Sequence, residues 1–220
     1  MTVRPTLRVE RRLLGNGARS VACIDEVGRG ALAGPVTVGV VVVSAGSARP
    51  PRGVRDSKAL TADERARLLP QIQEWAVAWS VGHASAGEID SDGIMGALRT
   101  ATMRALGALA SRPDVILLDG DRDFLTPSTQ VTLWEQVPAM DFPPVTTIVR
   151  GDGRCVGIAS ASIVAKCARD EFMVDLATTF PQFQWQQNKG YGTKEHLAAI
   201  ERHGASSEHR RSWRLPIPAT

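Results

Sequence analysis

The 220-residue sequence has few of the residues that build sulfur or imidazole sites. Its three cysteines, Cys23, Cys155 and Cys167, lie far apart and form no CxxC pair. An odd number of scattered cysteines argues against a disulfide framework and against a zinc knuckle. The four histidines show no HExxH spacing and no GxSxG segment is present, so zinc peptidase and serine hydrolase chemistry lack their parts.

Long apolar runs are also missing. No stretch reaches the roughly 18 to 20 uncharged residues that a membrane-spanning helix needs. The N-terminal segment contains arginines but no apolar core of the kind found in a signal peptide. We therefore expect a cytoplasmic protein with no membrane association. With 43% hydrophobic residues, the chain can bury the core of a single globular domain.

The excess of positive charge is small. Lysine and arginine number 26 against 23 acidic residues, which gives a net charge of +3. This balance mildly favours a polyanionic partner, but it lacks the strong basic character of a protein that coats DNA.

Common nucleotide and calcium motifs are absent or incomplete. GRGALAG (28–34) has three residues between its second and third glycines, where the dinucleotide fingerprint has two, and no GxxxxGK[ST] segment occurs. DGDRDF (119–124) begins like a calcium loop but has Phe124 where that loop needs glycine. Nucleotide-cofactor folds and an EF-hand are therefore disfavoured.

Short apolar runs rich in β-branched residues predict the strands. They cover residues 21–25, 36–43, 76–84, 113–121 and 145–153, and the first two suit an antiparallel pair. Helices are predicted over 61–75, where Thr61 and Glu64 form a capping-box signature, over the residues after Asp92, and over 156–180. Strands followed by alternating helices and strands indicate an α/β fold with a mixed sheet covered by helices.

Three of the predicted strands end in carboxylates. Asp25 and Glu26 close the first run, and Asp119 and Asp152 lie near the ends of two later runs. If these strands are neighbours, the four acids converge at one edge of the sheet. For any one of them a solvated turn residue is the simpler interpretation, and their joint occurrence is what favours a shared site.

A shared site needs a bend and a way to offset repulsion. Consecutive side chains on a strand point to opposite faces, so Asp25 and Glu26 can share a site only if the chain bends, for which Gly28 and Gly30 are suited. Clustered carboxylates require raised pKa values or hard divalent cations, and an all-oxygen set suits Mg²⁺ or Mn²⁺ better than zinc. Two such ions about 4 Å apart would support phosphodiester hydrolysis.

Several longer motifs follow one another along the chain. They are IDEVGRGALAGPV (24–36), DSKALT (56–61), LLDGD (117–121), RGDG (150–153), ASASIVAKCARDEFM (159–173) and NKGYGTKEHLAAIERHGASSEHRRSW (188–213). Together they span nearly the whole chain, which resembles ribonuclease HII. The resemblance implies an RNase H-like α/β fold, with a mixed five-stranded sheet, flanking helices and a C-terminal helical segment, in a catalytic domain of residues 20–215. Residues 1–19 would be an N-terminal extension whose order the sequence leaves open.

The resemblance also implies an activity. Members of this family hydrolyse the RNA strand of RNA/DNA hybrids and cut 5′ of ribonucleotides embedded in duplex DNA, with two Mn²⁺ or Mg²⁺ ions. The family's four acidic ligands fall on Asp25, Glu26, Asp119 and Asp152, while Asp170 is better explained by an ion pair or a cap. The expected partners are hybrid duplexes and ribonucleotide-containing DNA. We expect a monomer, and the sequence names no replication-associated protein partner.

Substrate contacts follow from the same resemblance. Gly28, Arg29 and Gly30 would place backbone against the minor groove at an RNA-to-DNA junction, where exposed backbone groups can read the 2′-hydroxyl. Tyr191, the only tyrosine, would stack its ring on the sugar that follows the ribose. Apart from the resemblance, the candidate phosphate contacts are Lys58, Lys166, Lys189, Arg210 and Arg211, because affinity for a duplex depends largely on phosphate neutralisation. For each of them singly, a solvated surface charge is the alternative.

Two other functions are compatible with this kind of fold. One is a catalytically silent binder of hybrid duplexes, and the other is a nuclease directed at DNA. The presence of all four acids argues against the first. The intact GRG segment together with Tyr191 argues against the second.

Overall fold

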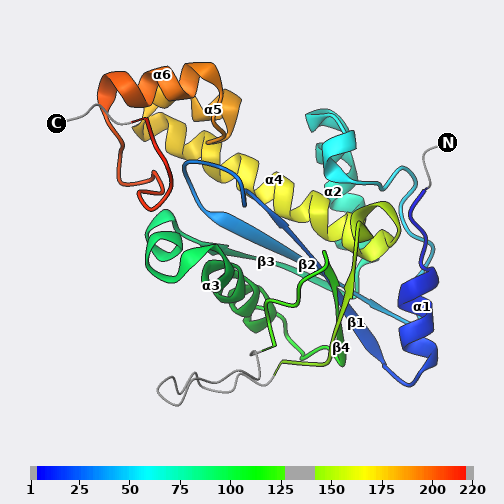
Figure 1. The fold of residues 1–220 in the computed structure, drawn as a ribbon. Coiled ribbons are helices and arrows are strands. Elements are labelled where there is room, and N and C mark those ends of the chain that lie inside the picture. The colour runs from blue at the N-terminus through cyan, green and yellow to red at the C-terminus, as the bar shows by residue number, and fades with distance from the viewer. Residues whose placement is uncertain (1–3, 127–141, 217–220) are drawn as a thin grey trace, which may run out of the picture.

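A five-stranded sheet with helices on both faces forms the body of the protein (Figure 1). The computed structural model describes residues 4–126 and 142–216. The strands are β1 Ser20–Val27, β2 Val36–Ser44, β3 Ala78–Ala84, β4 Val115–Asp119 and β5 Val145–Ile148. The α-helices are α1 Arg8–Gly15, α2 Ala62–Trp75, α3 Ala86–Gly107, α4 Val156–Thr179, α5 Trp185–Asn188 and α6 Lys194–His203, with short 3₁₀ turns at Ser57–Ala59, Gly151–Gly153 and Pro181–Phe183.

The sheet is mixed, as predicted. Its strand order is β3-β2-β1-β4-β5, with β1 antiparallel to β2 and parallel to β4. β2 and β3 pair antiparallel, and β4 and β5 pair parallel. The predicted antiparallel pair of strands at 21–25 and 36–43 is therefore confirmed. β1 is the central strand, so its residues are buried from both sides.

Two apolar layers cover the two faces of the sheet. Alternate residues of β1 face opposite layers: Val21 and Cys23 pack in the layer that includes α4, and Ala22 and Ile24 pack in the layer that includes α3. Figure 1 shows these two helices on opposite sides of the strands. This period of two decides which side chains of β1 can share a site.

Helix starts follow their capping residues. The predicted capping box at the start of α2 is confirmed, because the Thr61 side chain accepts from the Glu64 N–H and the Glu64 carboxylate accepts from the Thr61 N–H. α3 begins at Ala86, earlier than the predicted start after Asp92, because Ser85 and Glu88 form a second capping box. Gly93, with φ of 69°, breaks the helical path inside α3. It separates the capping box at Ser85 from the helix predicted after Asp92.

The run at 145–153 is a strand for only part of its length. β5 ends at Ile148, and Arg150 adopts a left-handed conformation with φ of 55°. The chain then forms the 3₁₀ turn Gly151–Gly153, which carries Asp152. Asp152 is therefore a turn residue beyond the strand, so the predicted strand was too long here.

The N-terminal segment belongs to the packed body. Leu7 is buried in the layer that includes α4, and the Glu10 side chain is fully buried. Thr6 pairs with Cys155 in an isolated parallel bridge. Part of the predicted N-terminal extension, including Thr6, Leu7 and Glu10, thus packs against the domain.

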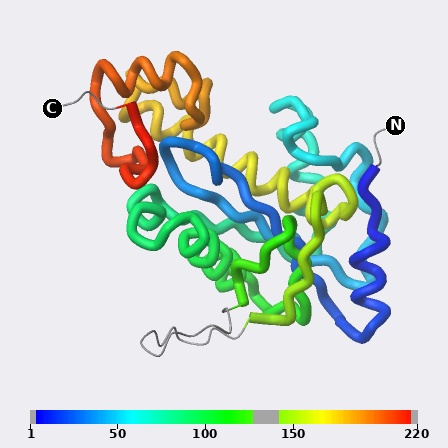
Figure 2. Tube along the Cα trace, in the orientation of Figure 1, coloured from blue at the N-terminus to red at the C-terminus, as the bar shows by residue number. Residues whose placement is uncertain are grey.

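The connection between β1 and β2 lies against the C-terminal part of the chain. Figure 2 shows the loop after β1 beside the segment that contains α5 and α6. The Gly190 carbonyl accepts from the Leu32 N–H at 2.8 Å, and the Leu32 carbonyl accepts from the Arg210 N–H at 2.9 Å. In the part of the chain that is described, no helix is both long and apolar enough to cross a membrane.

Gly39 tests how closely α4 must approach the sheet. It pairs with Asp25 across the β1–β2 ladder, and a Cβ on it would lie 2.4 Å from the Ala161 carbonyl oxygen. We expect Gly39→Ala to lower the free energy of unfolding by about 1 to 3 kcal/mol, the usual cost of overpacking. Gly46→Ala, whose Cβ would meet nothing closer than Ser44 Oγ at 3.9 Å, is the control. Equal urea midpoints for the two variants would contradict this packing.

Candidate active site

Three carboxylates meet on the α4 face of the sheet. One ligand oxygen from each of Asp25, Asp119 and Asp152 lies within 4.8 Å of the others. The parallel register pairs Ile24 with Leu118, so Asp25 and Asp119 are neighbours one step further along β1 and β4. Asp152 reaches them from the turn that follows β5. The predicted convergence of acids is therefore found for three of the four.

Burial sets the electrostatics of this cluster. Asp25 is 4% exposed, and burial followed by the charge of Glu26 raises its pKa well above the ordinary value, although the nearby Ser162 hydroxyl works against the shift. Burial also raises the pKa of Asp119, with a further contribution from Asp152. The protein alone therefore disfavours the fully ionised cluster.

Glu26 lies outside this group of three. β1 continues as a strand through Val27, so Glu26 points to the face opposite Asp25, and the bend expected at this pair is absent. Its carboxylate lies 3.6 Å from Arg29 Nη1. Burial raises the pKa of Glu26, the Arg29 charge lowers it and the Asp119 charge raises it, so Glu26 still senses the cluster from its rim.

Main-chain donors orient two of the acids. Asp25 Oδ1 accepts from the Glu26 N–H at 2.8 Å, and Asp119 Oδ1 accepts from the Gly151 N–H at 2.6 Å. The second bond joins the end of β4 to the turn that carries Asp152. Both carboxylates are therefore held by backbone, which moves less than side chains do.

The donor set suits a hard divalent cation. Asp25 Oδ2 is buried and has no hydrogen-bond partner among the described residues. An unpaired buried carboxylate oxygen is costly, and here it lies in a group of carboxylates that offers only oxygen ligands. Mg²⁺ and Mn²⁺ prefer such ligands, so these residues fit the metal that the sequence predicts.

Lys58 is the predicted lysine that approaches the acids. Its Nζ lies 3.7 Å from Asp152 Oδ2 and 3.8 Å from Asp56 Oδ1, while most of its side chain is exposed. Partial burial acts to lower its pKa, but the charge of Asp56 and of the acid cluster outweighs this and leaves the pKa raised. Lys58 thus carries a firmly held positive charge at the open side of the site.

Asp170 supports the segment that carries Lys58. It forms ion pairs with Arg65 at 3.4 Å and with Lys166 at 2.5 Å, in agreement with the role expected for it. Arg65 Nη1 in turn donates to the carbonyls of Ser57 and Leu60. Asp170 is absent from the metal-competent group among the described residues.

The other two predicted lysines are less available for phosphate. Lys166 is mostly buried and is bound to Asp170. Lys189 adopts a left-handed conformation with φ of 51°, and its ammonium donates to the Gln186 carbonyl. Burial lowers the pKa of Lys189. Neither geometry brings a free ammonium to the cluster.

Two buried arginines hold the GRG loop, here residues 28–35. Arg169, on α4, donates to the carbonyls of Pro35, Ala33 and Lys189 at 2.9, 3.1 and 2.8 Å. Arg210 donates to the carbonyls of Gly28, Arg29 and Gly34 at 2.7 to 3.2 Å. The prediction that Arg210 contacts phosphate is wrong, because its guanidinium is fully buried and engaged with main chain. Arg211 is exposed, so its predicted phosphate contact stays a prediction.

Arg169 could have been found in the sequence. Ala161, Ala165, Arg169 and Met173 recur at four-residue steps on the buried face of α4, so an arginine stands where the pattern asks for a small or apolar residue. A charged residue on a buried helix face must find several acceptors. The carbonyls of the GRG loop supply them.

The two glycines of the GRG motif differ in role. Gly28 has φ of 83°, and a Cβ there would lie 2.0 Å from Arg169 Nε. Gly30 has no such constraint: a Cβ would meet nothing within 4 Å. The packing of this chain therefore explains Gly28, whereas Gly30 presents an open stretch of backbone to the outside.

Tyr191 lies beside Arg169 at the surface. The Arg169 guanidinium carbon is 5.4 Å from the centre of the tyrosine ring, and the residue is 36% exposed. The Tyr191 carbonyl accepts from His196 Nδ1 at 2.9 Å. The main chain at Tyr191 is thus anchored, while part of its ring remains accessible.

Two buried histidines support this anchor. Trp185 Nε1–H donates to His196 Nε2, so His196 carries its proton on Nδ1, and His209 Nε2 must donate to the same His196 nitrogen at 3.1 Å. His209 Nδ1 accepts from the Ser206 N–H. Burial, then the His196 charge, lowers the pKa of His209 to about 4, so both rings are neutral near pH 7.

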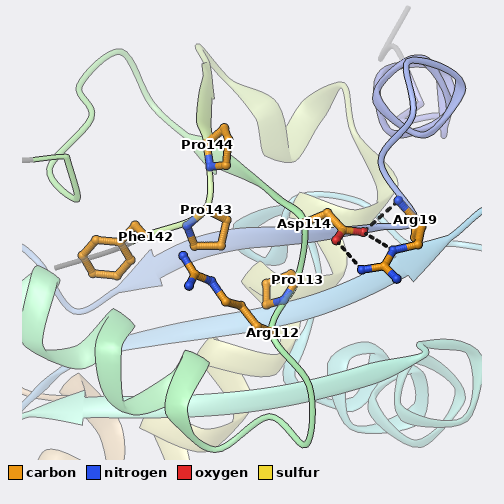
Figure 3. A pocket seen from close by; sticks show the side chains of 7 residues that line it. All are labelled: Arg19, Arg112, Pro113, Asp114, Phe142, Pro143 and Pro144. Atoms are coloured by element: carbon orange, nitrogen blue, oxygen red, sulfur yellow. Dashed lines mark hydrogen bonds and ion pairs between the residues drawn. The ribbon is translucent and has the colours of Figure 1, made fainter.

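A pocket lies at the opposite end of the sheet. Figure 3 shows that Arg19, Arg112 and Asp114 line it together with Phe142 and three prolines. Arg19 and Asp114 form an ion pair at 3.1 Å just before β1 and β4 begin. Since the acid cluster lies towards the other end of these strands, this pocket is separate from the site.

Comparison with known proteins identifies the family. Residues 22–215 match the family model for Ribonuclease HII. Ribonuclease HII of Streptomyces coelicolor is 42% identical over 210 residues, which cover 95% of this chain and 83% of that protein. The solved ribonuclease H2 from Pyrococcus horikoshii OT3 has a TM-score of 0.69 at 23% identity, over 90% of this chain and 95% of that chain. Bst-RNase HIII, solved in complex with Mn²⁺, has a TM-score of 0.60 at 19% identity, over 86% and 64%. The chain belongs to the ribonuclease HII family.

Membership establishes the class of activity. The chain is a ribonuclease H, a hydrolase that acts as an endonuclease on RNA/DNA hybrids. The alternative of a catalytically silent hybrid binder finds no support among these relatives, which carry the name of the enzyme.

The raised pKa of Asp25 predicts a stability effect. Its folded-state pKa lies above that of the unfolded chain, so ionisation costs stability as pH rises from about 4 through the folded value. In chelator at pH 7, Asp25→Asn should therefore unfold at a higher urea concentration than the parent. Its free energy of unfolding should be larger by on the order of 1 kcal/mol. This difference in free energy of unfolding should vanish below about pH 4. Added Mg²⁺ should reduce the difference, because it stabilises the parent.

Asp114→Asn is the control with the opposite sign. Its hydrogen bonds with Arg19 lower the pKa of Asp114 to about 2, so this carboxylate stabilises the fold above the unfolded pKa. Removing it should reduce stability at pH 7. If Asp25→Asn also reduced stability in chelator at pH 7, the description of the cluster as electrostatically strained would be wrong.

Proposed function

We propose that the carboxylate cluster is the hydrolytic centre of this endoribonuclease. The observation that carries the proposal is the approach of Asp25, Asp119 and Asp152 oxygens to within 4.8 Å of one another. These three residues, with Glu26 at the rim, would hold two Mg²⁺ or Mn²⁺ ions. When bound, such ions activate water and stabilise the leaving oxygen of a phosphodiester. The Mn²⁺ bound to the fold neighbour Bst-RNase HIII supports this choice of metal.

The surrounding residues keep the centre in place. The Gly151 N–H fixes the Asp119 carboxylate in one orientation, and the Glu26 N–H does the same for Asp25. Lys58, 3.7 Å from Asp152, places positive charge where the scissile phosphate would approach. Fixed donors and charges of this kind contribute to catalysis because they need not reorganise during the reaction.

We propose that the GRG loop and Tyr191 recognise the ribonucleotide. Gly30 leaves its backbone open on the outside, where N–H and C=O groups can bond a 2′-hydroxyl. Arg29 is mostly exposed and would meet the phosphates, and the accessible part of the Tyr191 ring would lie on the neighbouring sugar. The protein would then cut 5′ of a ribonucleotide, including a single one embedded in duplex DNA, and leave 3′-hydroxyl and 5′-phosphate ends.

We further propose that the enzyme acts as a monomer. The three buried apolar clusters that the described residues form are each assembled within one chain. The catalytic acids also come from one chain, so the proposed centre needs no second copy.

The centre is tested with duplex DNA that contains one ribonucleotide. Asp119→Asn should lose cleavage by more than the roughly 10- to 100-fold typical of a residue that only supports a ligand, while it retains binding to the duplex. Asp121→Asn, an exposed acid two residues further on, is the matched control and should cleave normally. Normal turnover by Asp119→Asn would remove this carboxylate from the centre, and equal cleavage of an all-DNA duplex would refute ribonucleotide recognition.

Tyr191 is tested by separating its ring from its hydroxyl. Tyr191→Ala should lower kcat/KM on the single-ribonucleotide duplex by about tenfold, near the low end of what stacking contributes, and Tyr191→Phe should lose far less. Trp79→Ala removes another exposed aromatic side chain, on the edge strand β3, and should leave kcat/KM unchanged. A loss in Tyr191→Phe as large as that in Tyr191→Ala would assign the function to the hydroxyl.

A further inference from the structure

The N-terminal arm, residues 4–15, contacts the chain between the catalytic turn and α4. It precedes residue 22, where the match to the family model begins. The Thr6 N–H donates to the Arg154 carbonyl at 3.0 Å, and the Val156 N–H donates to the Thr6 carbonyl at 3.2 Å. In Figure 2 the arm runs beside this part of the chain. It therefore borders the short segment that joins Asp152 to the helix.

Glu10 fills a position that α4 itself leaves empty. Cys155, the N-cap of α4, makes no side-chain capping bond. Instead, Glu10 Oε1 accepts from the Gly157 N–H at 2.8 Å. Gly157 is the second residue of the helix, and its N–H is one of the donors that an N-cap side chain usually satisfies. Glu10 thus caps α4 from a distant part of the chain.

The site around Glu10 is closely packed. Glu10 is 0% exposed, and a Cβ on Gly157 would lie 2.3 Å from Cys23 Sγ and 3.2 Å from Glu10 Oε1. Burial raises the pKa of Glu10, while the Gly157 N–H acts to lower it. Glu10 Oε2 has no partner among the described residues. Burying an acid with one unsatisfied oxygen lowers the stability of the fold. The hydrogen bond to Gly157 therefore calls for an explanation beyond stability.

The capped end of α4 is joined to two catalytic acids. The Cys155 N–H donates to the Gly151 carbonyl at 2.7 Å, and the Gly151 N–H donates to Asp119 Oδ1 at 2.6 Å. Asp152 lies between Gly151 and Cys155, in the turn Gly151–Gly153. The start of α4, Gly151 and the Asp119 carboxylate are therefore linked by hydrogen bonds, and Asp152 lies in the linked turn.

We propose that Glu10 is a positioning residue for the metal centre, which it aligns by fixing the first turn of α4 and thereby the turn that carries Asp152. This inference rests on the proposed function of the carboxylate cluster. The acceptor oxygen is what matters, so Glu10→Gln, which keeps an oxygen at the same place, should preserve the arrangement. Glu10→Ala leaves the Gly157 N–H without its partner and frees the turn.

The test measures Mn²⁺ binding by isothermal titration calorimetry in the absence of nucleic acid. Glu10→Ala should bind Mn²⁺ about 10-fold more weakly than the parent, the low end of the loss seen when a group that orients a ligand is removed. Glu10→Gln should bind like the parent. Ile89→Val, a core change in α3 on the other face of the sheet, controls for loss of stability and should also bind like the parent.

The outcomes separate the two proposals. If Glu10→Ala binds Mn²⁺ as tightly as the parent, or if Glu10→Gln is weakened as much as Glu10→Ala, the positioning role is overturned while the metal centre stands. If the parent itself binds no Mn²⁺, or if Asp119→Asn binds it equally well, the metal centre fails and the positioning role falls with it. As a second readout, the kcat of Glu10→Ala is measured at saturating Mn²⁺. It should return to the parent value there, because excess metal compensates for weaker binding.

Discussion

The repulsion among three clustered carboxylates, one buried and two half-buried, is the constraint that the rest of the structure has to satisfy. Asp25, Asp119 and Asp152 approach within 4.8 Å, and burial already raises the pKa of the first two. Such a cluster survives only on a framework that gains more from its own packing than it loses here. The framework is the central strand β1, buried on both faces, with β4 beside it in parallel register. That register places Asp25 and Asp119 side by side, so their main chains cannot move apart without breaking the ladder.

The GRG loop depends on a different kind of constraint. Arg169 and Arg210 are buried without a carboxylate partner close enough for an ion pair among the described residues, and burial lowers the pKa of both, that of Arg210 to about 9. Their partners are main-chain carbonyls, all but one of them in the GRG loop. The loop is therefore as well fixed as a secondary-structure element, although it has no regular backbone pattern. Because two positive charges lie beneath it, the same loop also presents a favourable field to a polyanionic backbone.

The sequence predicted the sheet and the acids because both follow local rules. The strands were predicted from β-branched runs, and the period of two places Asp25 and Glu26 on opposite faces unless the chain bends at this pair. The expected bend at this pair failed because β1 gains ladder bonds to β2 through Val27, and Gly28 turns the chain only afterwards. What the sequence could not predict are contacts between distant segments. Nothing near Arg210 distinguishes it from its exposed neighbour Arg211, since its burial depends on carbonyls about 180 residues away.

The carboxylate cluster and the GRG loop are thus held by separate supports that share one helix. α4 contributes Ser162 beside the acids, and two turns further on it contributes Arg169 to the GRG loop. Its N-cap Cys155 is bonded to Gly151, beside Asp152, and its middle contacts the sheet at Gly39. A rigid helix that contacts both supports fixes the distance between the carboxylates and the loop that would read the ribose. The proposed cleavage at a defined bond relative to the ribose would require that fixed distance, because an error of about 1 Å in placing the phosphate costs on the order of a hundredfold in rate. The burial of Arg169 in the middle of α4 therefore lowers stability but fixes the position of the GRG loop.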